Sequence, residues 1–300
     1  MNNKYYFDEN GFFTFRPKIN DETFNKALKA FKLILEKSQN ELYKKIRVYD
    51  DYFLKINVSG IENIFDEQII HQDILNLINE SNIVDVAREV LEEDEIILTL
   101  CRIHVTDKTN HLGIWHRDAE HNNSESLQMN IYLFDEMGME IVNKSHKREN
   151  LPRETLIINS KPYSNLEDVS HINVKAKNMI AFNPSLIHRG KTLKKRAHLH
   201  FRFTKKKALP ELVDKSSSLI YLDNYKIEKN LKNLLLNSAK HGYIYDTKNY
   251  VRKKNFKINF LRMLRFFIHK FLFFLEYDNK IYLKINVRPC LKLRKIFGLR

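Results

Sequence analysis

The sequence has little cysteine, and its two cysteines form no recognisable site. Cys101 and Cys290 lie far apart and belong to no CxxC pair. This spacing excludes a disulfide framework and a zinc site built on cysteine pairs, and it is typical of a reducing compartment. We interpret both as buried small apolar side chains.

Long apolar runs are also missing. No stretch reaches the roughly 18 apolar residues of a membrane-spanning helix, and the opening MNNKYYFDENGFF does not combine a basic segment with an apolar one. We therefore expect a cytoplasmic protein. No internal repeat or low-complexity linker is visible, which favours a single domain over residues 1–240.

Positive charge is abundant but unevenly distributed. The formal net charge is +14, and residues 251–300 hold 14 Lys and Arg against 2 Asp and Glu. Residues 1–250 hold 37 against 35. The basic character therefore belongs to a C-terminal extension over 241–300 and does not indicate a nucleic-acid surface on the main body.

Within that extension, residues 256–275 have the pattern of an amphipathic helix, with a Phe-rich stripe opposite Arg and Lys. Such a helix can lie at an anionic membrane surface, which would make the protein peripheral there, or it can dock on the main body. Both interpretations stay open. Nucleic-acid binding is disfavoured because the aromatics are grouped for burial and not interleaved as a stacking platform.

The main body divides into a helical part and a β-rich part. Apolar residues at helical spacing over 1–94 predict helices at 21–40, with a cap at Asn20 or Asp21, and at 64–80 and 82–92. From Glu95 onward, strands are predicted at 96–105, 126–134, 139–142, 155–159, 178–182 and 197–203. No crossover helices separate them, so we expect a β-sandwich or barrel over 95–204, with helices outside and a closing segment over 205–240.

Histidine is concentrated in the β-rich part, which holds nine of the twelve. His116 and Asp118 in GIWHRDAEH are followed by His188 in FNPSLIHRG. On a strand, residues two apart project from one face and can bind one ion. Two imidazoles and one carboxylate on one face of an octahedron leave three positions open, which suits non-haem Fe(II) and O2 chemistry.

A His-X-Asp tripeptide alone is weak evidence, since roughly one is expected by chance in a chain of this composition. A second one, His71-Gln72-Asp73, falls within a predicted helix, where residues two apart point in different directions. We reject it as a metal site.

The sequence around His116 and His188 resembles the phytanoyl-CoA dioxygenase family of Fe(II)/2-oxoglutarate oxygenases over residues 95–204. WHRDA is similar to the family's first two iron ligands, LQMNIYLFDEMGMEIVNKSHK to its next strand and turn, KAKNMIAFNPSLIHRG to the strand of the distal histidine, and KKRAHLHFRF to its final strand. Asn143-Lys144 departs from the usual Pro-Gly of that turn. The resemblance implies a double-stranded β-helix, the cupin-like jelly roll, with a helical N-terminal region.

The resemblance also implies residue roles. Fe(II) would be bound by His116, Asp118 and His188. Arg196 would pair with the distal carboxylate of 2-oxoglutarate, the co-substrate used with O2. Arg202 is the alternative, because it shares a strand face with Arg196 and the spacing from His188 to Arg196 is slightly short for the family. Arg102, on the strand before His116, is a further candidate for co-substrate binding.

The implied activity is a dioxygenase reaction that converts 2-oxoglutarate and O2 to succinate and CO2 and hydroxylates an unactivated C–H bond. The carboxylate of Asp118 favours hydroxylation or a related oxidation over halogenation, since related halogenases carry a small residue there. The expected substrate is a small molecule, a lipid or a glycan precursor. Lysines near the predicted site suggest that it is anionic: Lys191, Lys194, Lys195, Lys205, Lys206 and Lys207.

Two other functions are compatible with the sequence. One is a non-catalytic β-sandwich binding protein, attached to membrane or nucleic acid by its basic tail. The other is a sandwich that binds a different divalent metal for isomerase or hydrolase chemistry, which would leave Arg196 without a role. Dependence on 2-oxoglutarate distinguishes the oxygenase from both.

Overall fold

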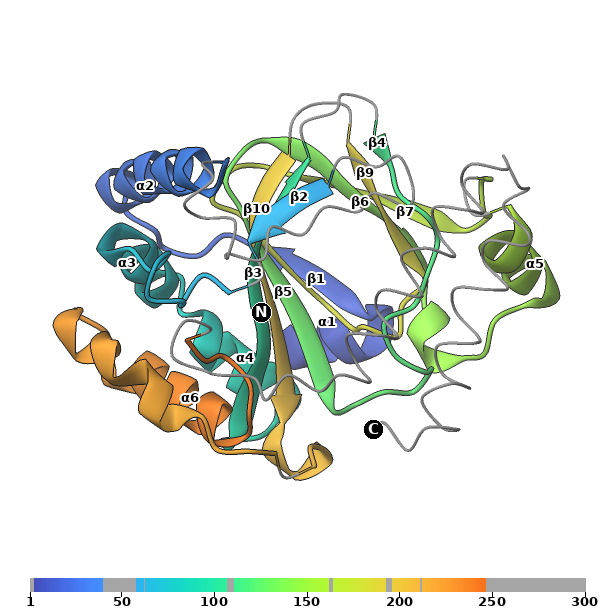
Figure 1. The fold of residues 1–300 in the computed structure, drawn as a ribbon. Coiled ribbons are helices and arrows are strands. Elements are labelled where there is room, and N and C mark those ends of the chain that lie inside the picture. Colours follow the sequence, from blue (N-terminus) through green and yellow to red (C-terminus); the bar gives the residue numbers. More distant parts are fainter. Residues whose placement is uncertain are drawn as a thin grey trace, which may run out of the picture.

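A computed structural model describes residues 3–39, 58–61, 63–106, 111–161, 164–192, 196–210 and 212–246 (Figure 1). The expected helix over 256–275 lies outside these residues, so both interpretations of it stay predictions. Of the helices in the described part, none has the length and apolar character to cross a bilayer.

In the described residues, ten antiparallel strands form two sheets that face each other (Figure 1). The six-stranded sheet has the order β1 (Phe12–Phe15), β8 (Met179–Phe182), β5 (Ser126–Tyr132), β10 (Arg196–Lys205), β3 (Ile96–Thr106), β2 (Val58–Ile61). The four-stranded sheet has the order β4 (His111–Leu112), β9 (His188–Thr192), β6 (Glu136–Val142), β7 (Val169–Val174). From β3 to β10 the chain passes repeatedly between the sheets, as in a jelly roll. The predicted antiparallel sandwich is confirmed.

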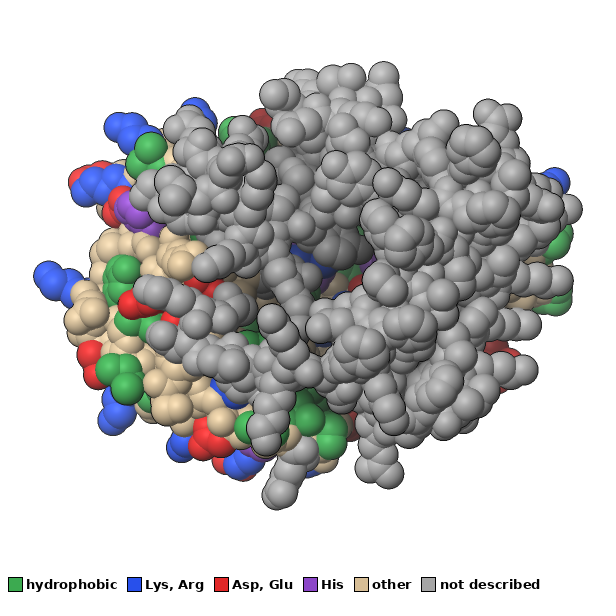
Figure 2. Space-filling model, in the orientation of Figure 1, with side chains coloured by type: hydrophobic (Ala, Val, Ile, Leu, Met, Phe, Trp, Pro, Cys, Tyr) green, Lys and Arg blue, Asp and Glu red, His purple; other side chains and the backbone are tan. Residues whose placement is uncertain are grey.

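Helices cover the outer face of the six-stranded sheet and build the larger core with it (Figure 1). They are α1 (Asn3–Asn10), α2 (Asp21–Gln39), α3 (Gln72–Glu80), α4 (Ile83–Leu91) and α6 (Lys229–Lys240). The helices predicted at 21–40 and 82–92 are confirmed, and Asn20 caps α2 by accepting the Glu22 N–H at 2.8 Å. The surface over α2, α3 and α6 mixes both charge signs, as expected for a solvated layer (Figure 2).

The predicted helix over 64–80 begins only at Gln72. His71 is its N-cap, and the His71 Nδ1 accepts the Asp73 N–H at 3.2 Å. The preceding residues form turns in which the Asp66 carbonyl accepts two backbone N–H groups. His71-Gln72-Asp73 is therefore a helix start.

The strand predicted at 155–159 is wrong, because these residues lie in α5 (Pro152–Ser160). Pro152 favours the first helical turn, and Glu154 accepts the Leu151 N–H at 2.7 Å while pairing with Arg148 at 2.7 Å. These contacts at the helix start outweigh the β propensity of the Thr-Leu-Ile-Ile run. Conversely, β1 and β2 lie within residues 1–94, the region that was expected to be helical.

Candidate metal centre

Two chain segments bring the predicted ligands together at one end of the sandwich. His116 and Asp118 follow β4, and His188 begins β9. His116 and His188 form a backbone bridge in which each N–H donates to the other's carbonyl at 3.0 Å. The Asp118 N–H donates to the Pro184 carbonyl at 2.9 Å, which fixes the carboxylate beside the imidazoles.

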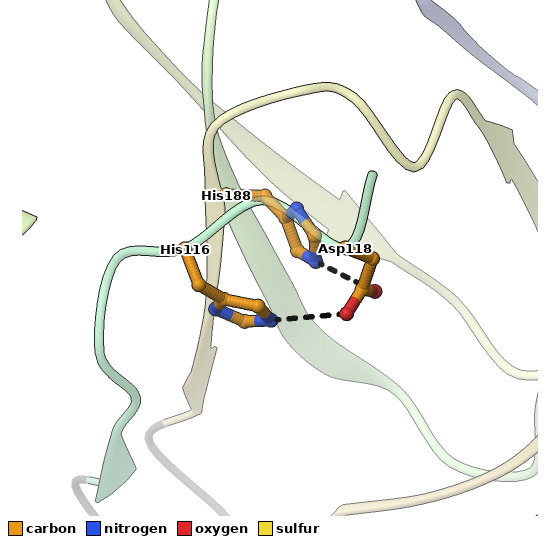
Figure 3. Close-up of side chains that lie close together, drawn as sticks. All are labelled: His116, Asp118 and His188. Atoms are coloured by element: carbon orange, nitrogen blue, oxygen red, sulfur yellow. Dashed lines mark ion pairs between the residues drawn. The ribbon is translucent and has the colours of Figure 1, made fainter. Parts of the chain in front are cut away.

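The three side chains point toward one another (Figure 3). The His116 Nε2 lies 4.0 Å from Asp118 Oδ1, and the His188 Nε2 lies 3.8 Å from Asp118 Oδ2. The three ligand atoms all lie within 4.8 Å of one another. Ligand atoms on one face of an octahedron with bonds of about 2.0–2.2 Å lie about 3 Å apart, so the three side chains would have to move inward by about 1 Å to bind one ion. In the described part of the chain, no other group of three His, Cys, Asp or Glu has this geometry.

Both imidazoles are oriented by backbone contacts. The His116 Nδ1 lies 2.9 Å from the Ile114 carbonyl, and the His188 Nδ1 lies 2.9 Å from the Leu186 carbonyl. A carbonyl only accepts, so each Nδ1 carries the proton and each Nε2 presents its lone pair toward Asp118. This is the tautomer that binds a metal through Nε2.

The charge states also suit a cation. Burial opposes ionisation of Asp118, but neighbouring groups outweigh it and lower its pKa to about 2; they are His188, His116, Arg202 and Gln128. Burial, followed by repulsion from His116, lowers the pKa of His188 to about 4. At neutral pH the carboxylate is therefore charged and His188 is neutral, as metal binding requires.

A polar floor lies beside the triad on the inner face of β5, β10 and β3. Cross-strand register places Gln128 opposite Arg202, and His200 between Asn130 and Arg102. Four atoms of this floor are buried and have no hydrogen-bond partner within the described residues: Gln128 Oε1, Asn130 Oδ1, His200 Nε2 and Arg202 Nε. Buried polar atoms without partners are costly and rare, so this cluster is suited to a polar ligand.

The arginines proposed for 2-oxoglutarate are placed differently. Arg202 reaches the triad, with its Nη2 3.2 Å from Asp118 Oδ2. Arg102 lies on the inner face opposite His200, and burial together with the Arg102 charge lowers the pKa of His200 well below its usual value. Arg196 begins β10 opposite Thr106, and its side chain lies outside the described residues.

Three of the lysines proposed to face an anionic substrate make ion pairs. Lys191 pairs with Glu140 at 2.7 Å, Lys206 with Glu95 at 2.8 Å, and Lys207 with Glu93 at 3.5 Å. Lys194 and Lys195 lie outside the described residues. An anionic substrate stays a prediction.

Sequence reasoning did not single out Gln128 or Asn130, although a signal is present. In SLQMNIY, they are polar residues at alternate positions of an otherwise apolar strand. Both are buried, with exposures of 0% and 5%. Polar side chains on the inner face of a core strand indicate a ligand or a hydrogen-bond network.

No family model and no curated protein matches the sequence, so the likeness to the phytanoyl-CoA dioxygenase family stays a prediction.

Solved structures do match. EctD from S. alaskensis with 2-oxoglutarate and 5-hydroxyectoine is 16% identical, with 69% of this chain and 77% of that chain covered and a TM-score of 0.53. HygX from Streptomyces hygroscopicus with nickel and 2-oxoglutarate is 15% identical (73% and 92% covered, TM-score 0.51). AviO1 from Streptomyces viridochromogenes Tue57 is 14% identical (69% and 96% covered, TM-score 0.53). At these identities the likeness establishes the fold alone, and the chain shares the jelly roll of these proteins.

Proposed function

We propose that the protein is an Fe(II)- and 2-oxoglutarate-dependent dioxygenase. The observation that carries the proposal is the triad of His116, Asp118 and His188, in which backbone contacts aim both Nε2 atoms at the carboxylate. EctD and HygX, which have the same fold, hold 2-oxoglutarate in their structures, and HygX also holds nickel.

The donor set fits a ferrous ion. Two imidazoles and one carboxylate on neighbouring segments leave the opposite side free for a bidentate oxoacid and O2. Bound Fe(II) would supply the electron transfer to O2 by which 2-oxoglutarate is decarboxylated and the substrate oxidised. The backbone carbonyls of Ile114 and Leu186 orient the two imidazoles that would bind the ion.

The floor fits the co-substrate. Arg202, Arg102 and the buried amides offer cations and hydrogen-bonding groups to a dicarboxylate, and the partnerless atoms lie on this surface. Along β10, His200 lies two residues and about 7 Å from Arg202, whereas Arg196 lies six residues and about 20 Å away. Arg202 contacts Asp118, and Arg102 is the cross-strand partner of His200, so both lie nearer the triad than Arg196. Arg102 and Arg202 are therefore favoured over Arg196 as partners of 2-oxoglutarate bound at the triad.

The reaction proposed is hydroxylation of a small molecule, a lipid or a glycan precursor. The rival function, a non-catalytic binding protein, gives no reason for two imidazoles with matched Nδ1 contacts to converge on one carboxylate. A different divalent metal in the same triad would leave the four buried atoms of the floor, Gln128 Oε1, Asn130 Oδ1, His200 Nε2 and Arg202 Nε, without a ligand. Both arguments favour the oxygenase.

The test is the visible charge-transfer band that Fe(II) and 2-oxoglutarate produce together under anaerobic conditions. We expect the band in the wild type and its loss in His116→Ala. His121→Ala is the matched control, because His121 is a partly exposed histidine five residues away that lies 4.0 Å from Glu149. A folded wild type with no band would overturn the proposal and favour the binding protein.

A further inference from the structure

Gln128 makes the shortest contact to the carboxylate of the triad among the polar side chains of the floor. Its Nε2 donates to Asp118 Oδ2 at 2.6 Å, and its side chain is fully buried on β5. The Arg202 Nη2 lies 3.2 Å from the same oxygen. Gln128 and Arg202 are cross-strand partners, so two adjacent strands place a hydrogen-bond donor and a cation at Oδ2.

The two carboxylate oxygens therefore have different surroundings. Each oxygen faces one imidazole, since Oδ1 lies 4.0 Å from His116 Nε2 and Oδ2 lies 3.8 Å from His188 Nε2, but only Oδ2 also has the Gln128 amide and the Arg202 guanidinium beside it. A carboxylate that binds a metal through one oxygen occupies one position, and one that binds through both occupies two. Holding Oδ2 away from the ion preserves an open position for co-substrate or O2.

We propose that Gln128 is a positioning residue that holds Asp118 to binding the metal through Oδ1 alone. The inference rests on the proposed function for the identity of the ion. The amide suits this task because only its NH2 end can face the carboxylate; the flipped amide would place Oε1 against a negative charge. Its Oε1 has no hydrogen-bond partner in the part of the chain described here, so the contact with Asp118 determines its orientation.

Arg202 is not equivalent to Gln128, although it forms an ion pair with the same oxygen. Its guanidinium carries a positive charge, which repels a divalent cation bound beside Asp118. The neutral amide of Gln128 orients the carboxylate without that repulsion. Removing the Gln128 amide and removing the Arg202 guanidinium should therefore change metal affinity differently.

The test uses Co(II) alone, without 2-oxoglutarate, and measures affinity by calorimetry and coordination by visible absorption. We expect Gln128→Met, which keeps the side-chain length but removes the donor, to weaken Co(II) binding about 10- to 100-fold, the range for lost ligand-orienting contacts. The absorption should also change as Oδ2 becomes free to bind. Ser126→Ala is the control, because Ser126 lies on the same strand and face but contacts Thr204 at 3.2 Å.

Gln128→Met with wild-type affinity and spectrum would overturn the inference. If Gln128→Met fails to fold, Gln128→Asn replaces it; its amide is one methylene too short, and we expect the same loss. Arg202→Met should bind Co(II) no more weakly than the wild type, and a loss as large as that of Gln128→Met would contradict the special role of Gln128. If the wild type binds Co(II) but gives no charge-transfer band with Fe(II) and 2-oxoglutarate, only the proposed function fails.

Discussion

The guanidinium of Arg189 lies 4.3 Å over the ring of Trp115, and both side chains are buried, with exposures of 1%. Trp115 precedes the ligand His116, and Arg189 follows the ligand His188. The Trp115 Nε1 and the Arg189 Nη1 both donate to the Ser164 carbonyl, at 2.8 and 3.3 Å. The outer sides of the two ligand-bearing segments are thus joined while their inner sides present the imidazoles.

Arg189→Lys should lower stability and weaken metal binding together. Lysine keeps the charge but loses the planar stack on Trp115 and the forked hydrogen bonds, which are worth about 1–2 kcal/mol at a buried site. Urea denaturation and Co(II) titration measure the two effects. Arg153→Lys is the control, because the Arg153 pair with Glu167 is exposed and should change stability by about 0.5 kcal/mol or less. Equal effects of the two substitutions would contradict a special role for the stack.

Glu140→Gln should destabilise the protein in a pH-dependent way. Burial raises the pKa of Glu140, but hydrogen bonds from Lys191 and Arg189 outweigh it and lower the pKa below its ordinary value of 4.5. A carboxyl group whose pKa is lower in the folded than in the unfolded protein stabilises the fold at pH values above the unfolded-state pKa. This stabilisation is lost as the pH falls through the folded-state pKa.

The stability difference between wild type and Glu140→Gln should therefore be largest above pH 4.5 and shrink on further acidification. Near neutral pH we expect a loss of about 3 kcal/mol, since Arg189 would stay buried without its carboxylate. Thermal unfolding across pH 3 to 7 measures this. A difference that is constant over the whole range would show that Glu140 acts by packing and not by charge.

The sequence allowed His116, Asp118 and His188 to be grouped through the His-X-Asp spacing and the family resemblance, although His116 and Asp118 lie after β4 and not on a strand. The positioning role proposed for Gln128 depends on the pairing of β5 with β10 and on the distance to Asp118. The spacing of residues along the sequence predicts neither. The wrong prediction of a strand at 155–159 has a similar cause. The helix at these residues is stabilised by the contact of Glu154 with Arg148, six residues earlier, which the propensities of residues 155–159 do not reveal.

Gly11→Ala should destabilise the loop that leads to His188. Gly11 has a φ of +81°, its carbonyl accepts the Asn183 N–H at 2.7 Å, and an added Cβ would lie 2.6 Å from His146 Nδ1. The backbone conformation alone costs an alanine about 1–3 kcal/mol, and the contact adds to this. Asn10→Ala in the same turn is the control, with an expected change of about 0.5 kcal/mol or less. Denaturant titrations of the two variants give the comparison.

Substitution of the arginines should identify the one that binds 2-oxoglutarate. Arg102→Leu is expected to weaken 2-oxoglutarate binding to the Fe(II)-loaded protein by tenfold or more, since a charge-assisted contact to a carboxylate is worth about 1.5–3 kcal/mol. Arg196→Leu should have a much smaller effect, because its Cα lies about 20 Å along β10 from Arg202. Titration of the charge-transfer band measures both affinities. The reverse order would assign the distal carboxylate to Arg196, as the family resemblance implies, and would require its side chain to extend along the inner face past His198 toward the triad.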